Sequence, residues 1–131
     1  MGKGTILKGI AAAVVLTAAF TGSAMAGTAY TDYNTTVGRF NGNGYSKSQT
    51  KAIGGANGYI LSGVVGANYT VDVRMNCNKG NASWLRDLDD NQSKWLPGYY
   101  KQTAGESIKL QFSNDLLTPV AVQVDGRWKS N

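Results

Sequence analysis

The segment WLRDLDDNQSKW, which spans residues 84–95, holds the side chains of this chain that could do metal chemistry. Four of its carboxylate and amide residues fall within five positions, and they are Asp87, Asp89, Asp90 and Asn91. Oxygen ligands of this kind suit Ca²⁺, and an EF-hand loop places them at alternate positions. The segment therefore raises the question of a calcium site.

The spacing departs from an EF-hand at its two most specific positions. Counted from Asp87, the turn glycine is replaced by Gln92 and the bidentate glutamate by Gly98. Asp87, Asp89 and Asn91 stay as a weaker alternative, a calcium site that is not of the EF-hand type.

A β-hairpin explains the same segment with fewer exceptions. A two-residue loop of Asp90 and Asn91 suits the left-handed conformation that Asp and Asn tolerate. The resulting register gives an opposite-charge pair, an apolar pair and a cation–aromatic pair. These pairs are Asp87 with Lys94, Leu85 with Leu96, and Arg86 with Trp95. We therefore expect a hairpin with Asp90 and Asn91 at its tip.

Catalytic residues are scarce elsewhere. The chain has no histidine, and Glu106 is its one glutamate. This composition excludes Ser-His-Asp and Cys-His catalysis and the usual zinc sites. A hydrolytic carboxylate pair is not indicated by any spacing. The sequence predicts a protein that is not an enzyme and that has no cofactor.

Aromatic residues offer a second kind of chemistry, which is binding. Five tyrosines lie among polar neighbours, and they are Tyr30, Tyr33, Tyr45, Tyr99 and Tyr100. Exposed rings next to amides suit sugars, because a ring stacks on the apolar sugar face. Ordinary packing in β-sheets is the alternative explanation. Our candidate ligand-binding residues are Trp84, Trp95, Tyr99 and Tyr100, around the turn WLPGYY.

The N-terminus has the order of a secretory signal peptide. Lys3 and Lys8 precede an uncharged apolar run over residues 10–20, and TGSAMAG follows with small residues at the A-x-A positions. The run is shorter than the roughly 20 apolar residues that span a bilayer. We predict a signal peptide over residues 1–26, cleaved after Ala26, and a secreted protein with no stable transmembrane segment.

The remaining chain, residues 27–131, has the size of one domain. Cys77 is its only cysteine, so no internal disulfide can form. Eleven basic and eight acidic side chains leave a net charge of +3, spread singly along the chain. The absence of a basic block argues against nucleic acid as a partner. The positive sign favours a cell-wall polymer or another anionic surface, and a protein partner is also compatible.

Alternation of apolar and polar residues is the dominant pattern in this domain, and it predicts half-buried β-strands. The inward positions form three sets. They are Tyr69, Val71, Val73, Met75 and Cys77; Ile108, Leu110 and Phe112; and Val120, Val122, Val124 and Trp128.

The pairing of these strands can also be predicted. Pairing Ile108 with Val124 and Leu110 with Val122 puts all the apolar residues of the last two strands on one side of an antiparallel pair. NGNG, residues 41–44, predicts a second hairpin between NTTVGRF and YSKSQTKAI. About eight short strands with regular turns predict an all-β fold, a single antiparallel β-sandwich over residues 27–131.

Several segments resemble small exported β-proteins of Gram-positive bacteria of the Bacillus kind. These segments are AMAG, NTTVGRFNGNGY, FSNDLLTPVAVQV and GRWKSN. The resemblance implies origin and export, and it supplies no site residues. The signal, the small size, the strand content and the terminal Gly-x-Trp-x-Ser are also similar to lactococcin-type bacteriocins.

The function that these observations predict is non-catalytic. We expect an exported protein that acts at the cell envelope or outside the cell and binds a surface, a polymer or a protein. The alternative is a secreted bacteriocin-like antagonist or membrane-active toxin.

Overall fold

The computed structural model describes residues 25–131, which contain β-strands and turns and no helix. The expected signal peptide lies outside these residues except for its last two, which form β1. The strands are β1 (Met25–Ala26), β2 (Thr31–Val37), β3 (Asn43–Tyr45), β4 (Gln49–Thr50), β5 (Gly58–Val65), β6 (Val71–Asn76), β7 (Leu85–Leu88), β8 (Ser93–Leu96), β9 (Ser107–Ser113) and β10 (Val122–Lys129).

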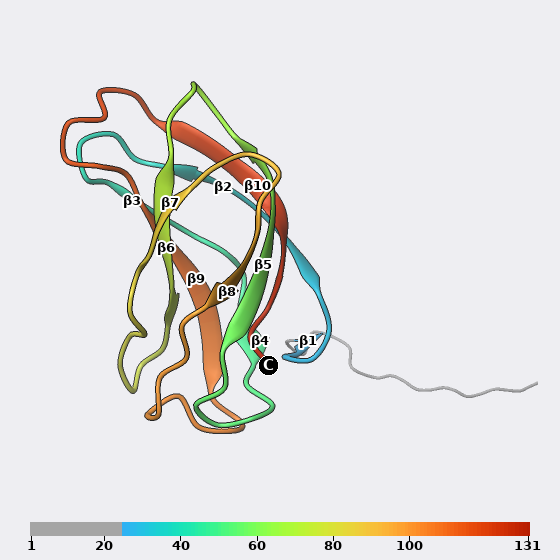
Figure 1. The fold of residues 1–131 in the computed structure, drawn as a ribbon. Coiled ribbons are helices and arrows are strands. Elements are labelled where there is room, and N and C mark those ends of the chain that lie inside the picture. The colour runs from blue at the N-terminus through green and yellow to red at the C-terminus, as the bar shows by residue number, and fades with distance from the viewer. Residues whose placement is uncertain (1–24) are drawn as a thin grey trace, which may run out of the picture.

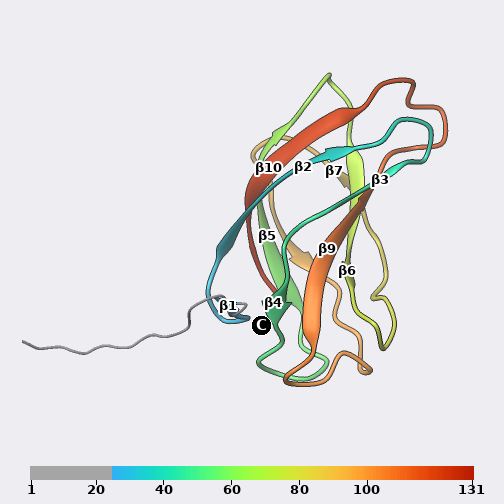
Figure 2. The ribbon, with the colours of Figure 1, turned by 180° about the vertical axis from the view of Figure 1, so that it is seen from behind.

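Two sheets pack face to face (Figures 1 and 2). The six-stranded sheet has the order β1-β4-β9-β6-β7, and β3 also pairs with β9. The four-stranded sheet has the order β2-β10-β5-β8. All pairs are antiparallel except β1 with β4. The predicted all-β sandwich is confirmed.

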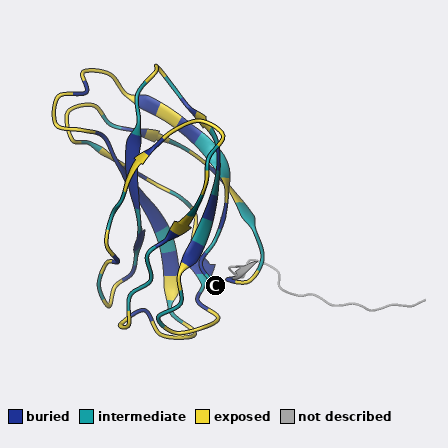
Figure 3. Ribbon diagram, in the orientation of Figure 1, coloured by how far each residue is buried: buried dark blue, intermediate teal, exposed yellow. Residues whose placement is uncertain are grey.

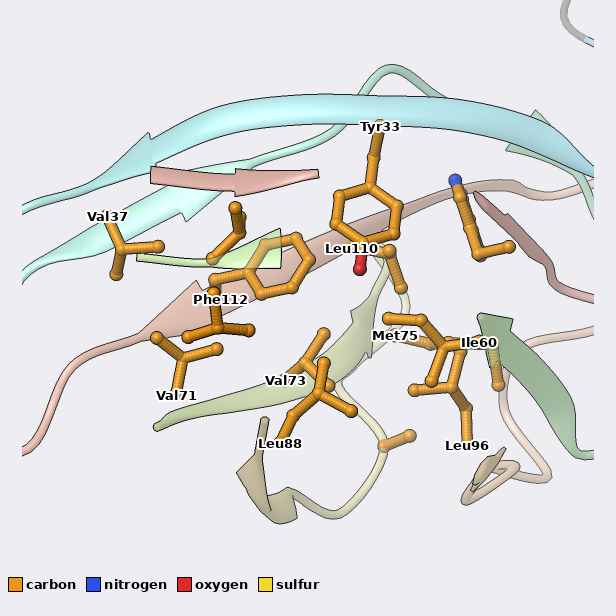
Figure 4. Close-up of a cluster of buried hydrophobic side chains, with 14 of the residues drawn as sticks. Tyr33, Val37, Ile60, Val71, Val73, Met75, Leu88, Leu96, Leu110 and Phe112 are labelled. Carbon is orange, nitrogen blue, oxygen red and sulfur yellow. The ribbon is translucent and has the colours of Figure 1, made fainter. Parts of the chain in front are cut away.

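The predicted alternation places the core correctly. The apolar residues of β6 and β9 that were expected to point inward are fully buried. Cys77, just after β6, is a buried free thiol. Side chains from both sheets meet in one cluster, which includes Tyr33, Met75, Leu110 and Phe112 (Figure 4). Burial follows the strands, and the connecting loops are mostly exposed (Figure 3).

One inward position was predicted wrongly. Val122, Val124 and Trp128 of β10 are fully buried, but Val120 lies before the strand and is 40% exposed. The pairing of β10 with β5 shifts register between Asp125 and Gly126, and the extra residue is Gly63 of β5. An added Cβ at Gly126 would meet the carbonyl oxygen of Leu61. Because the extra residue lies in β5, β10 keeps its alternation, and Val124 and Trp128 both point inward.

The predicted pairing of the last two strands is wrong. β9 pairs with β6, β3 and β4, whereas β10 pairs with β2 and β5 in the other sheet. The apolar sides of β9 and β10 therefore face each other across the core. Alternation shows which side of a strand is buried. It does not show whether two strands are neighbours in one sheet or lie in opposite sheets, because the same apolar sides are buried in both arrangements.

The two predicted hairpins are wrong for the same reason. β2 and β3 belong to different sheets, and so do β7 and β8. The turn before β3 has positive φ at Phe40 and Asn41, while the predicted turn residues Asn43 and Gly44 lie within β3. β6 and β7 form a hairpin between consecutive strands in one sheet. Most other connections from β2 onward cross between the layers.

Buried polar residues tie the end of one sheet to the end of the other. Gln49 of β4 donates to the carbonyl of Trp128 at 2.8 Å and accepts from the amide of Ser130 at 2.8 Å. Lys51 is 1% exposed, and its ammonium donates to the carbonyls of Ala56 and Ser130, each at 2.6 Å. Burial lowers the pKa of Lys51 to about 8, because the charged form loses hydration.

Candidate functional site

The acidic segment forms a turn that crosses from one sheet to the other. The amide of Val65 donates to the carboxylate of Asp90 at 2.6 Å, and the amide of Asn91 donates to the carbonyl of Gly63 at 3.0 Å. Asn91 has a φ of 52°, the left-handed conformation expected of it. The carboxylate of Asp89 accepts from the amide of Asp90. These contacts hold the turn against β5.

Asp87 points to a different group of carboxylates. One of its oxygens, one of Asp72 and one of Asp115 all lie within 4.8 Å of one another. Asp89 and Asn91, the other residues of the weak metal alternative, are not part of this group. Within residues 25–131, these three carboxylates form the one group of at least three potential ligands that are close enough to hold a metal ion.

Asp72 is engaged within the protein. Arg86 donates to one of its oxygens at 2.6 Å, and the backbone amide of Asp87 donates to the other at 3.0 Å. A register shift between β6 and β7 brings both donors opposite Asp72, and Asp87 takes a φ of 58° there. These bonds give the buried Asp72 carboxylate the partners that its desolvation requires.

Trp84 lies beside this group, on the outer face of the six-stranded sheet. The guanidinium of Arg74 lies 4.2 Å from its ring centroid, and that of Arg86 lies at 5.8 Å. Arg74 also donates to Gln111 at 2.8 Å, and Gln111 donates to Asn43 at 3.1 Å. A polar hollow of about 400 Å³ borders Trp84, Asp72 and Asp115. The residues around the ring bond mainly to one another.

Trp95 lies on the opposite side of the molecule, on the outer face of the four-stranded sheet. It is 61% exposed and is paired in register with Tyr59 of β5. The two rings are in edge-to-face contact, with centroids 4.8 Å apart. The next strand continues the row, because Tyr59 is paired with Lys129 of β10.

A third ring extends this row. The ammonium of Lys129 lies 5.0 Å from the ring centroid of Tyr30, and the guanidinium of Arg127 lies 5.7 Å from the same centroid. Trp95, Tyr59, Lys129 and Tyr30 therefore cross the four-stranded sheet from β8 toward β2. We call these four residues the aromatic row.

Polar side chains occupy the other end of the same face. The hydroxyl of Thr36 donates to Gln123 at 3.0 Å, and the amide of Gln123 donates to Asn34. A hollow of about 630 Å³ lies along β2 and is lined by Asn34 and Tyr45, among others. The face thus offers exposed rings, two cations, and amide and hydroxyl groups within one sheet.

The other two predicted ligand-binding residues lie in the loop after β8. Tyr99 is half-buried and packs against Gly80 in a neighbouring loop. Tyr100 is 74% exposed, in edge-to-face contact with Tyr99 at 5.1 Å. The four predicted residues are therefore divided among three places: Trp84 on one outer face, Trp95 on the other, and the two tyrosines in an end loop.

Sequence reasoning missed two members of the aromatic row. Tyr59 alternates with the buried Ile60, so its outward direction could have been inferred from YILSGVV. Lys129 follows the buried Trp128 in the same way. Their position beside Trp95 could not be inferred, since it depends on β5 pairing with both β8 and β10. Tyr33, grouped with the polar tyrosines, is a core residue, and burial raises its pKa.

Residues 25–131 contain no helix long and apolar enough to cross a membrane. Comparison with protein-family models, with curated proteins and with solved structures finds no match for this chain. The resemblance to exported Bacillus-type proteins and to bacteriocins therefore stays a prediction.

Proposed function

We propose that this chain is an exported, non-catalytic protein that binds a polysaccharide of the cell envelope or the extracellular space. The binding surface is the outer face of the four-stranded sheet. The observation that carries the proposal is the aromatic row, in which Trp95, Tyr59 and Tyr30 lie on one side of one sheet with Lys129 among them.

The chemistry of the row suits sugars. Aromatic rings offer an apolar surface for the C–H face of a sugar ring, and Tyr also has a hydroxyl for hydrogen bonding. Rings anchored on strands lose little conformational entropy when a ligand binds, because they have only two side-chain torsions. Asn34 and Gln123 supply amides on the same face for the sugar hydroxyls.

The charge of the row selects among polymers. Lys129 has no carboxylate partner among the described residues, and Arg127 has only the exposed Asp32, at 3.7 Å. Cations that are free to meet a ligand favour a polymer with carboxylate or phosphate groups. We therefore propose an anionic cell-wall polymer as the ligand class.

Retention on insoluble polymers tests this proposal. The wild-type protein is mixed with purified Gram-positive cell wall, chitin and cellulose, and the bound fraction is measured against polymer concentration. Trp95→Ala removes the most exposed ring of the row, and we expect about tenfold weaker binding, as for an aromatic residue that carries much of the binding energy. Phe40→Ala is the matched control, since Phe40 is an exposed ring in the turn before β3, away from the aromatic row.

Salt dependence separates the contributions of rings and charge. Lys129→Gln should weaken retention on cell wall and reduce its sensitivity to salt, while leaving binding to cellulose unchanged. The proposal fails if wild type is retained on none of the three polymers, or if Trp95→Ala and Phe40→Ala bind equally well.

A further inference from the structure

Two loops lie side by side at one end of the sandwich, residues 38–42 and 114–121 (Figure 1). Their exposed large apolar residues are Phe40, Leu116, Leu117 and Val120. Leu117 is 84% exposed, the highest value among the exposed large apolar residues of the described chain. We call these four residues the apolar tip.

The tip is held in place by hydrogen bonds between its loops. The backbone amide of Phe40 donates to the carbonyl of Thr118 at 2.8 Å, and the backbone amide of Asn41 donates to the carbonyl of Asp115 at 3.1 Å. The buried side chain of Asn114 donates to the carbonyls of Val37 at 3.1 Å and Gly38 at 2.8 Å. The exposed apolar side chains are therefore presented by an ordered backbone, and their exposure is a property of the fold.

Exposed apolar residues gathered at one place indicate an interaction surface. Thr118 is buried, and the other residues from Leu116 to Ala121 are exposed and uncharged. These side chains are exposed at one end of the sandwich, so the tip suits a surface into which it can insert. A lipid bilayer accepts small apolar groups at its interface in this way.

One cation of the tip loops suits the phosphate groups that every phospholipid headgroup carries. Arg39 lies at the rim of the tip, with its guanidinium 5.7 Å from the Phe40 ring centroid. Arginine next to inserted apolar groups can reach lipid phosphates. The one acid of the tip loops, Asp115, places its carboxylate near those of Asp72 and Asp87, in a hollow that Leu116 also lines.

We propose that the apolar tip docks the protein on a phospholipid bilayer, with Phe40 and Leu117 inserted at the acyl boundary and Arg39 at the headgroup phosphates. This surface is separate from the aromatic row, so the two proposals stand or fall independently. β1 and the C-terminus lie at the other end of the sandwich (Figure 1). A docked molecule would thus leave the four-stranded face open to a polymer.

A fluorescent label at the tip tests the insertion directly. In a Cys77→Ala background of the full chain, Leu117→Cys and, as a control at the opposite end, Tyr100→Cys each carry an environment-sensitive dye. Vesicles of phosphatidylcholine and phosphatidylglycerol in equal parts are then added. We expect a blue shift and a several-fold gain of emission for the label at position 117, with quenching by brominated lipid. The label at position 100 should change little.

A second variant measures how much Phe40 contributes to the affinity for lipid. Phe40→Ser in the labelled Leu117→Cys chain should raise the lipid concentration at half-response about tenfold. The reason is that moving an aromatic ring from water into the interface is favourable by more free energy than a tenfold change in affinity requires. Ile53→Ser, an exposed apolar residue at the other end, should not change it.

The outcomes separate the partners. Equal responses at positions 117 and 100, or no response at 117, would overturn the proposal. A response at 117 that depends on protein concentration without vesicles, with a dimer by sedimentation, would assign the tip to a second copy of this chain. Trp95→Ala should keep the lipid response, and Phe40→Ser should keep retention on polymer.

Discussion

Trp84 and Trp95 stand at the two ends of one acidic segment, yet they lie on opposite outer faces of the sandwich. Trp84 lies beneath Arg74, whose guanidinium also bonds Gln111. Trp95 is largely exposed, and its near neighbour is another ring, that of Tyr59. The same residue type therefore has a structural environment on one face and an open one on the other.

The difference extends to the charged residues of the two faces. On the six-stranded face, Asp72 is buried and accepts from Arg86 and from a backbone amide. On the four-stranded face, Asp32 is 89% exposed and lies 3.7 Å from Arg127. Polar groups that satisfy one another stabilise the fold, whereas exposed rings and weakly paired charges remain available for a ligand. Three changes can break or sharpen this comparison.

The largest effect is expected from the buried carboxylate. Asp72→Ala removes the acceptor of two bonds in a buried site, and it should lower the free energy of unfolding by about 2–3 kcal/mol. Asp32→Ala, its matched control on the other face, should lower it by about 0.5 kcal/mol or less. Urea denaturation of both variants measures the difference. Equal losses would show that the two faces do not differ in this way.

The second effect concerns Lys51, which joins the ends of the two sheets. Its pKa is about 8 in the folded protein and 10.5 ordinarily, so the unfolded chain holds more protons between these values. The free energy of unfolding should therefore rise with pH from 8 to 10, by up to about 2 kcal/mol. The two carbonyls that accept from the ammonium favour its charged form and reduce this value. Above pH 10 stability should fall, since burial raises the pKa of Tyr33.

Lys51→Met supplies the control for this pH dependence. The variant should lose the rise between pH 8 and pH 10 and keep the fall above pH 10. Chemical denaturation at several pH values measures both. A rise that persists in the variant would assign the effect to another group.

The smallest effect is the difference in stability between variants of the two tryptophans. Trp84→Ala loses its contact with Arg74 and part of its buried area, and it should cost about 1–2 kcal/mol of unfolding free energy. Trp95→Ala should cost about 0.5 kcal/mol, mainly the edge-to-face contact with Tyr59. Thermal and urea unfolding of both variants give the comparison. A larger loss for Trp95 would make its role structural and weaken the proposed binding face.

Particular residues show how far sequence reasoning reached. The inward sets of β6 and β9 were predicted residue by residue, because alternation records burial directly. The left-handed Asn91 and the turn around it were also predicted. The partners of Leu85 and Leu96 were predicted wrongly, because short-range turn signals were taken to imply pairing within one sheet. Asn43 was expected in a turn and lies in β3.

The candidate site could be predicted from the sequence only in part, for the same reason. Trp95 could be nominated from WLPGYY, but Lys129 and Tyr30 are distant from it in sequence and become its neighbours through β5 and β10. The apolar tip depends likewise on the two loops that Asn114 joins.

The sequence by itself determined the all-β class, the composition of the core and the positions of several turns. These follow from local alternation and from the backbone preferences of Asn, Asp and Gly, which each segment carries alone. Only the tertiary structure decided which strands are neighbours and which lie in opposite layers. Both arrangements bury the same apolar sides, so the choice depends on how all ten strands share one core, and that choice placed Trp84 and Trp95 on opposite faces.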